Sequence, residues 1–168
     1  SPDDIASITI ALRAEQAQWV AMGASGRAAC LNRFADAVMA EVGPLGQALS
    51  VDTGRSTFAQ VEAIKSVELI RMWAERAGPI LDELGGAGQS GQVPAVHYQH
   101  RLIPYQVVAV ISPWNVPLLL AMIDSLAALS AGCSVLLKPS EITPRFIEPL
   151  QRALDAVPEL AAVLRIVT

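Results

Sequence analysis

Residues 107–141 read VVAVISPWNVPLLLAMIDSLAALSAGCSVLLKPSE, and this stretch decides the fold of the chain. A continuous β-branched run at 107–111 and a second apolar run at 134–137 predict buried parallel strands. The apolar segment 118–131 between them predicts the crossover helix. Polar residues follow each strand directly, where open α/β sheets bind ligands. We therefore expect a βαβ unit with two candidate ligand-binding loops.

The sequence after this stretch extends the unit. Thr143-Pro144 predicts an N-cap and first helical residue, opening a helix to about residue 157. Residues 164–167 predict a third strand. The alternation predicts a parallel, Rossmann-like βαβαβ sheet, in which the strand at 107–111 is left as an open apolar edge.

The sequence before this stretch predicts helices. A break is expected at Gly43-Pro44, followed by a short helix at 45–51. A longer helix is expected to open with a Thr57-x-x-Gln60 capping box and to end at Gly78-Pro79. Its predicted apolar face consists of Val61, Ile64, Val67, Ile70 and Trp73.

A β-hairpin arm is expected between the helices and the sheet. Residues 85–91 (GGAGQSG) predict a loop, and the alternating residues 96–102 predict one strand of the arm. The fold class is therefore α/β. Its expected parts are a helical segment (1–92), the hairpin arm (93–106) and a partial Rossmann-like cofactor-binding unit (107–168).

Composition excludes several classes of protein. The 168 residues carry a net charge of −4 without a basic cluster, which argues against a nucleic-acid surface. Residues 104–123 lack charge over about the length of a membrane span, but Pro113, Asn115 and Pro117 would leave backbone groups unpaired in lipid. The N-terminus shows no signal-peptide pattern. We expect no membrane association and a cytoplasmic location.

Two cysteines and two histidines offer no metal-binding pattern. Cys30 and Cys133 lie far apart in the sequence and predict reduced thiols. His97 and His100 fall on the predicted strand and are expected to be exposed. We therefore expect no metal site.

A literal match to GxGxxG at residues 86–91 is not a phosphate-binding motif. That motif works only between a strand and the start of a helix. Here a helix precedes it and a strand follows, so a flexible turn is expected.

Two short motifs carry the candidate chemistry. Asn115, in Ser112-Pro113-Trp114-Asn115 after the first strand, supplies a neutral amide that can stabilise an oxyanion; alternatively, it caps the following helix. The Lys138-Pro139-Ser140-Glu141 loop follows the second strand. Its carboxylate can accept two ribose hydroxyls and its lysine can hold a ribose or phosphate oxygen; alternatively, both are surface charges on a turn.

A family resemblance extends over essentially the whole chain. ISPWN followed by AALSAGCSVLLKPSE is similar to the ISPWN-x-P and ALAAGN-x-V-x-KPSE blocks of aldehyde dehydrogenases. Upstream, WVAMGASGRAACLNRFADAV and LSVDTGRS resemble that family's W-x-R…L-x-x-L-A and L-E-T-G-K segments. The chain thus looks like the N-terminal part of an aldehyde dehydrogenase.

The resemblance implies roles for the two loops. Members of the family oxidise an aldehyde to a carboxylic acid with NAD(P)⁺ through a thiohemiacetal on a cysteine. It implies that Asn115 shares the oxyanion with that cysteine's backbone N–H. The implied cofactor contacts are Ile111, Ser112, Pro113, Trp114, Lys138, Ser140 and Glu141. The carboxylate of Glu141 would repel a 2′-phosphate, so NAD is expected, with NADP possible.

The chain departs from the family pattern at several positions. Cys133 stands where the family often has Asn, and Asp124 where many members carry Lys. Val116, Leu120 and Ile123 occupy places where aromatic residues are frequent. We expect these three to line an apolar substrate tunnel, and the substrate to be an apolar or aromatic aldehyde.

Other parts of the family's catalytic site are expected outside this sequence. The nucleophilic cysteine (G-Q-x-C) and the general-base glutamate (E-L-G-G) follow KPSE in the family, whereas Glu83-Leu84-Gly85-Gly86 precedes ISPWN and is in the wrong order. We expect a fragment of a longer polypeptide, inactive alone and a homodimer or homotetramer at full length. The alternative is a non-catalytic or split nucleotide-binding subunit that needs a partner chain.

Overall fold

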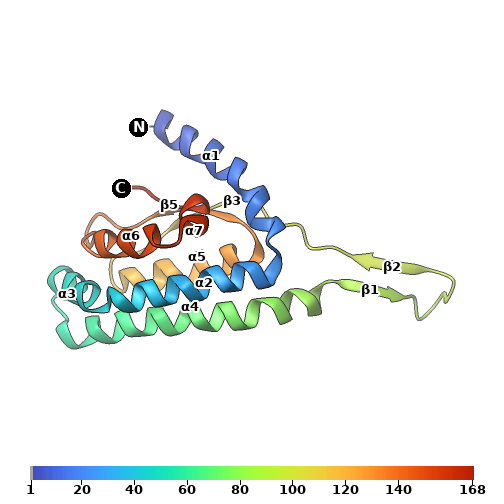
Figure 1. The fold of residues 1–168 in the computed structure, drawn as a ribbon, viewed down its shortest axis with the longest axis horizontal. Coiled ribbons are helices and arrows are strands. Elements are labelled where there is room, and N and C mark those ends of the chain that lie inside the picture. The colour runs from blue at the N-terminus through green and yellow to red at the C-terminus, as the bar shows by residue number, and fades with distance from the viewer. Residues whose placement is uncertain (1) are drawn as a thin grey trace.

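A computed structural model describes residues 2–168 as a helical body with a parallel sheet and a projecting hairpin (Figure 1). The first half contains α1 (Pro2–Ala21), α2 (Gly23–Ala40), α3 (Val42–Thr53) and α4 (Ser56–Leu84). The second half contains β1 (Gly86–Gln89), β2 (His97–His100), β3 (Val107–Ile111), α5 (Pro117–Ala131), β4 (Ser134–Lys138), α6 (Ile147–Asp155), α7 (Pro158–Val163) and β5 (Leu164–Ile166).

The parallel sheet has the order β3-β4-β5, which confirms the expected βαβαβ unit and the edge position of β3. Val107 pairs with Ser134, and Val135 pairs with Leu164. The connection from β3 to β4 and the connection from β4 to β5 both move across the sheet in the same direction. Right-handed crossovers therefore place α5 and α6 on one face of the sheet. The helix α1 crosses the other face, and α2 and α4 form an outer layer beyond α5 (Figure 1).

Hydrogen bonds attach α1 to the centre of the fold. Trp19 is buried and donates its indole N–H to the Leu129 carbonyl at 2.8 Å. Gln16 donates to the Gly132 carbonyl at 2.8 Å, and the Ser134 hydroxyl donates to the Leu12 carbonyl at 2.9 Å. The N-terminal helix is therefore fixed to the end of α5 and the start of β4.

The predicted end of the long helix is wrong, because α4 continues through Gly78 and Pro79 to Leu84. A proline inside a helix removes the hydrogen bond to the carbonyl four residues earlier. That carbonyl belongs to Glu75, an exposed residue, so water can satisfy it.

The predicted apolar face of α4 is only partly correct. Val67 and Ile70 are buried, but Val61 and Ile64 are 47% and 43% exposed. The face buried against α2, α3 and α5 is built mainly of small residues, with one acidic side chain: Ala59, Glu62, Ala63, Ser66, Val67, Ile70 and Ala74. Small side chains allow the neighbouring helices to approach closely.

Helix starts differ from the predictions at several places. The capping box at Thr57 is not formed: α4 begins at Ser56 without a side-chain cap. Gly43 and Pro44 lie in the first turn of α3, where a proline costs no hydrogen bond. The helix expected from Thr143-Pro144 begins only at Ile147. The Thr143 hydroxyl does not cap it but donates to the Trp114 carbonyl. The separate helix α7 was not predicted.

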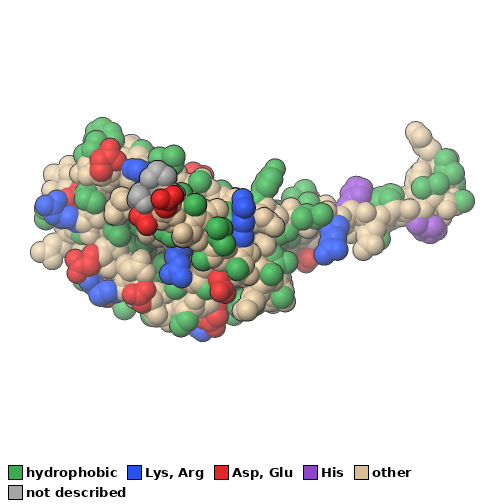
Figure 2. Space-filling view, turned by 90° about the horizontal axis from the view of Figure 1, so that it is seen from above, with side chains coloured by type: hydrophobic (Ala, Val, Ile, Leu, Met, Phe, Trp, Pro, Cys, Tyr) green, Lys and Arg blue, Asp and Glu red, His purple; other side chains and the backbone are tan. Residues whose placement is uncertain are grey.

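The hairpin arm contains a strand where the sequence predicted a loop. β1 pairs with β2 in antiparallel register, Gly86 opposite His100 and Gly88 opposite Tyr98. A Cβ at Gly88 would lie 2.4 Å from the Tyr98 hydroxyl, so glycine makes room for that ring. His97 and His100 are exposed, as expected. The arm extends away from the body and carries hydrophobic side chains near its tip (Figure 2).

Within residues 2–168, every helix falls short of the length or apolarity that a bilayer crossing needs.

Candidate functional site

The two motif-bearing loops meet at the carboxyl edge of the sheet. Ile111 pairs with Lys138 in the register of β3 and β4, and the Ser112 backbone N–H donates to the Lys138 carbonyl at 3.1 Å. The structure therefore brings Ile111, Ser112, Pro113, Trp114 and Asn115 beside Lys138, Ser140 and Glu141. Because ligands of open α/β sheets bind at this edge, the loops form the candidate site.

The loop that contains Asn115 is held through its backbone. The Trp114 carbonyl accepts a hydrogen bond from the Thr143 hydroxyl at 3.2 Å, and the Asn115 carbonyl accepts one from the Arg55 guanidinium. Arg55 immediately precedes α4. Asn115 itself is exposed. The amide side chain thus extends from a backbone that two other segments fix.

Asn115 does not cap the helix that follows it, which removes the structural alternative for this residue. Val116 occupies the N-cap position of α5, Pro117 is its first residue, and no side-chain cap is formed there by the cap residue. The Glu62 carboxylate instead accepts the N–H groups of Leu118 at 2.9 Å and Leu119 at 3.1 Å. Burial raises the pKa of Glu62, and these two N–H groups oppose the increase.

The side chains around these loops differ in exposure. Ile111 is 77% exposed and Trp114 is 56% exposed, which leaves two apolar surfaces at the sheet edge. Ser112 is buried, and its hydroxyl has no partner within the described part of the chain. Ser140 is buried too, but its hydroxyl accepts the Ile142 N–H at 3.2 Å. Ser112 therefore retains unused hydrogen-bonding capacity, whereas Ser140 stabilises its own turn.

Lys138 and Glu141 form an ion pair across the second loop. The Lys138 ammonium lies 3.1 Å from Oε2 of Glu141 and also donates to the Pro139 carbonyl at 3.2 Å. The backbone N–H of Glu141 and the Lys138 ammonium lower the pKa of the Glu141 carboxyl. The carboxylate is therefore ionised at neutral pH and is chemically suited to accept hydroxyl protons.

Val116, Leu120 and Ile123 share one side of the start of α5, at helical spacing. Val116 and Leu120 are half-buried, and Ile123 is 39% exposed. Asp124 is exposed beside them. The three apolar side chains form a surface next to the Asn115 loop that stays partly open.

The cysteines lie away from these loops. Cys30 is fully buried, and its sulfur accepts a hydrogen bond from Arg33 at 3.2 Å. Cys133 precedes β4 at the opposite end from Lys138, roughly 16 Å away at the usual rise of a strand. Burial raises the pKa of the Cys133 thiol, which disfavours the thiolate. Neither residue is placed to attack a substrate at the candidate site.

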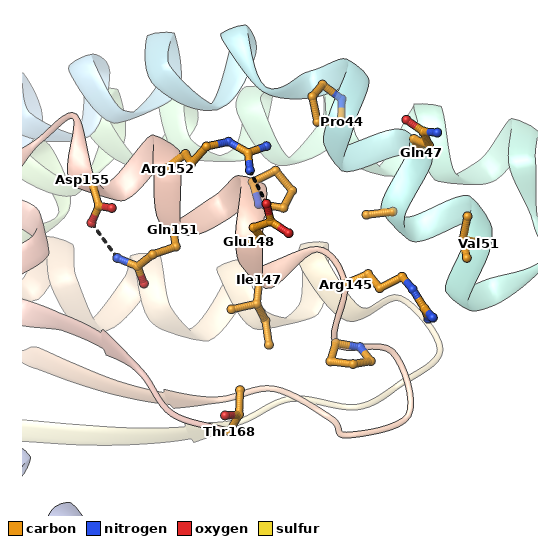
Figure 3. A pocket seen from close by; sticks show the side chains of 13 residues that line it. Pro44, Gln47, Val51, Arg145, Ile147, Glu148, Gln151, Arg152, Asp155 and Thr168 are labelled. Carbon is orange, nitrogen blue, oxygen red and sulfur yellow. Dashed lines mark hydrogen bonds and ion pairs between the residues drawn. The ribbon is translucent and has the colours of Figure 1, made fainter.

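A hollow of about 890 Å³ lies between α3 and α6 (Figure 3). None of the predicted site residues is among those that line it. Its charged residues already have partners: Arg152 pairs with Glu41 and Glu148, Arg145 pairs with Asp52, and Asp155 accepts from Gln151. Because its charged side chains are already paired with one another or with neighbours, we do not assign the candidate functional site to this hollow.

Three contacts around the Asn115 loop were not predicted: those of Arg55 and Thr143 with the loop backbone, and that of Glu62 with the first turn of α5. Glu62 carried a recognisable signal, because it is one acidic side chain at helical spacing among Ala59, Ala63 and Ser66. Arg55 carried none, since its contact with Asn115 spans 60 positions in the sequence.

Comparison with known proteins agrees with this arrangement. The chain matches the sequence model of the aldehyde dehydrogenase family over residues 1–168. It is 35% identical to the geranial dehydrogenase of Castellaniella defragrans over 74% of its own length and 26% of that protein, and 35% identical to acetaldehyde dehydrogenase 2 of Cupriavidus necator over 92% and 30%. Among solved structures, PutA of Anabaena variabilis superposes with a TM-score of 0.94 at 40% identity, covering 99% of this chain and 35% of that one.

The chain spans about a third or less of the length of these relatives. The family match covers the helical segment, the hairpin arm and the parallel sheet together. The fold, the two loops at the sheet edge and the extent of the match lead to one assignment: the chain belongs to the aldehyde dehydrogenase family.

Proposed function

We propose that this chain supplies the cofactor-binding and oxyanion-stabilising part of an NAD-dependent aldehyde dehydrogenase. The observation that carries the proposal is the junction of the two loops, where the Ser112 N–H bonds to the Lys138 carbonyl. This junction places the Asn115 amide and the Lys138–Glu141 pair at one edge of the sheet. The amide of Asn115 can donate a hydrogen bond to a developing negative charge, and the Lys138–Glu141 pair can bind the hydroxyls of a ribose.

The residues present fit a nicotinamide dinucleotide. Ser112 has a buried hydroxyl without a partner in the described chain, and Glu141 is an exposed, ionised carboxylate. Glu141 and Lys138 would hold the adenosine ribose, while Ile111, Ser112, Pro113 and Trp114 would line the rest of the cofactor, with Ser140 supporting the turn. When bound, the cofactor supplies the hydride acceptor.

Asn115 would act on the aldehyde oxygen. Attack of a thiolate on an aldehyde carbon leaves a negative oxygen, and a fixed amide N–H stabilises that charge without a change in protonation. The buried positions of Cys30 and Cys133 support a nucleophile, and with it a general base, outside residues 1–168. We therefore propose that residues 1–168 alone are inactive.

The first test concerns the substrate. Relatives of similar identity are named for aldehydes as different as geranial and acetaldehyde, so the argument rests on Val116, Leu120 and Ile123. We expect the full-length protein to reduce NAD with apolar or aromatic aldehydes at a higher kcat/KM than with small, strongly polar ones. NADH absorbance measures both rates. Equal turnover of the polar aldehydes would remove the apolar-tunnel proposal, and no turnover of any aldehyde would remove the proposed function.

The second test concerns the choice between NAD and NADP. We expect wild type to favour NAD, because the Glu141 carboxylate repels a 2′-phosphate. Glu141→Gln should lower the ratio of kcat/KM for NAD to that for NADP by roughly tenfold, a screened effect at an exposed site. Glu83→Gln, an exposed residue on α4, is the matched control and should leave the ratio unchanged. A wild type that prefers NADP would contradict the assignment of Glu141.

The hairpin arm supports assembly into a homo-oligomer. It extends from the body and carries exposed apolar residues: Val93, Val96, Tyr98, Leu102, Ile103 and Tyr105. Exposed apolar side chains on a projecting strand pair are typical of surfaces that other chains cover.

A further inference from the structure

Glu62 is an acidic residue buried between helices. It is 1% exposed and lies on the face of α4 that packs against α2, α3 and α5. Its Oε1 accepts two N–H groups from α5, while Oε2 is buried and has no partner within residues 2–168. Burying a carboxylate is costly unless its hydrogen bonds repay the cost. Within the described chain, the hydrogen bonds of this carboxylate go to the first turn of α5 alone.

That first turn needs a cap that its own sequence does not supply. The first N–H groups of a helix lack partners within it, and Pro117 contributes no N–H, so Leu118 and Leu119 are the donors to be satisfied. Asparagine is among the best capping residues, and Asn115 lies just before this helix. A local cap would use the side-chain oxygen of Asn115 as acceptor. It would turn the side chain toward α5, whereas the proposed chemistry needs its amide N–H directed at the substrate oxygen. The carboxylate of Glu62 caps the first turn of α5 instead.

The helix α4 contacts the Asn115 region at two points. Arg55, at its start, donates to the Asn115 carbonyl, and Glu62, further along, accepts from Leu118 and Leu119. Burial raises the pKa of the Glu62 carboxyl, and the positive charge of Arg55, which precedes α4, acts in the opposite direction. The backbone that follows the Cα of Asn115 is therefore held at two points by Arg55 and Glu62.

We propose that Glu62 is the positioning residue for Asn115: it caps α5 from a neighbouring helix, so the asparagine side chain is not turned toward α5 as a cap and can direct its amide N–H at the oxyanion. The role rests on the proposed function of Asn115. The positioning role depends on where the carboxylate oxygen of Glu62 lies relative to the N–H groups of Leu118 and Leu119. A displacement of about 1 Å in a catalytic group can cost on the order of 100-fold in rate.

Two conservative variants of the full-length protein separate position from charge. Glu62→Gln retains an acceptor oxygen at the same reach but removes the charge. Glu62→Asp retains the charge but withdraws the oxygens by about one bond, roughly 1.5 Å. Glu68→Gln is the matched control, since Glu68 lies on the same helix in an exposed ion pair with Lys65.

The positioning role predicts a specific order of activities. Glu62→Asp should lose more than roughly tenfold in kcat, with the KM for NAD unchanged, because cofactor contacts lie on other residues. Glu62→Gln should stay within about threefold of wild type. The reverse order, or equal kcat in all three variants, would overturn the proposal. A rise in the KM for NAD equal to the loss in kcat would also overturn it.

Hydrogen exchange supplies a readout that does not depend on activity. The amides of Leu118 and Leu119 should exchange at least tenfold faster in Glu62→Asp than in Glu62→Gln or Glu68→Gln. If wild type oxidises no aldehyde but this difference is present, the proposed function fails while the capping role of Glu62 stands. Identical exchange in the three variants would overturn the capping role, whatever the activity.

Discussion

Replacing Asn115 with alanine is expected to lower the kcat of the full-length enzyme by roughly 10²–10³, the usual effect of removing one oxyanion donor. The backbone of Asn115 is held by Arg55 through its carbonyl, and that contact does not need the amide side chain. Asn115 also does not cap α5. The variant should therefore fold normally and bind NAD with unchanged affinity, as steady-state kinetics and cofactor titration would measure.

Asn32→Ala provides the matched control, because Asn32 is an exposed asparagine on α2, away from the two loops. Its kcat should equal that of wild type. An Asn115→Ala enzyme that keeps full kcat would contradict the oxyanion role. A loss of thermal stability comparable to the loss of activity would assign Asn115 a structural role instead.

Replacing Trp19 with alanine is expected to have the largest effect on stability. Trp19 is 1% exposed and donates to the Leu129 carbonyl at 2.8 Å, so the change empties a large volume and removes a buried hydrogen bond. Such substitutions cost about 3–5 kcal/mol of the free energy of unfolding. Denaturant titration followed by circular dichroism measures this quantity.

Trp114→Ala is the control for the size of the side chain. Trp114 is 56% exposed at the sheet edge, so its removal should change the free energy of unfolding by less than about 1 kcal/mol. A loss in Trp19→Ala as small as the one expected for Trp114→Ala would show that the attachment of α1 does not depend on the indole of Trp19.

The sequence predicted the parallel unit well because its signal is local. The β-branched run at Val107–Ile111 became β3 with those bounds, and residues 134–137 became β4 with one more residue. Buried parallel strands have continuous apolar runs. The expected burial is found in β4, whereas β3, at the open edge of the sheet, buries Val110 and leaves Ile111 exposed. The predicted adjacency of the two loops also followed, since parallel strands end at the same edge.

Other features depended on distant partners that no local pattern contains. The segment Gly86–Gln89 has poor strand propensity and became β1 only because β2 pairs with it. Thr143 was expected to cap a helix, but its hydroxyl donates to the carbonyl of Trp114, 29 positions earlier in the sequence. The expected apolar face of α4 was wrong at Val61 and Ile64, which are exposed, because the buried face that contacts α2 and α5 is built mainly of small residues and contains Glu62.

The attachment of α1 has a consequence during synthesis on the ribosome. Trp19 is hydrogen-bonded to a residue 110 positions later in the chain. At about 5–20 residues per second, the partner of this helix is made roughly 5–20 s after the helix itself. During that interval the apolar side of α1, including Leu12 and Trp19, has no native surface to cover it. The nascent chain should therefore bind holdase chaperones until residues 118–134 have emerged.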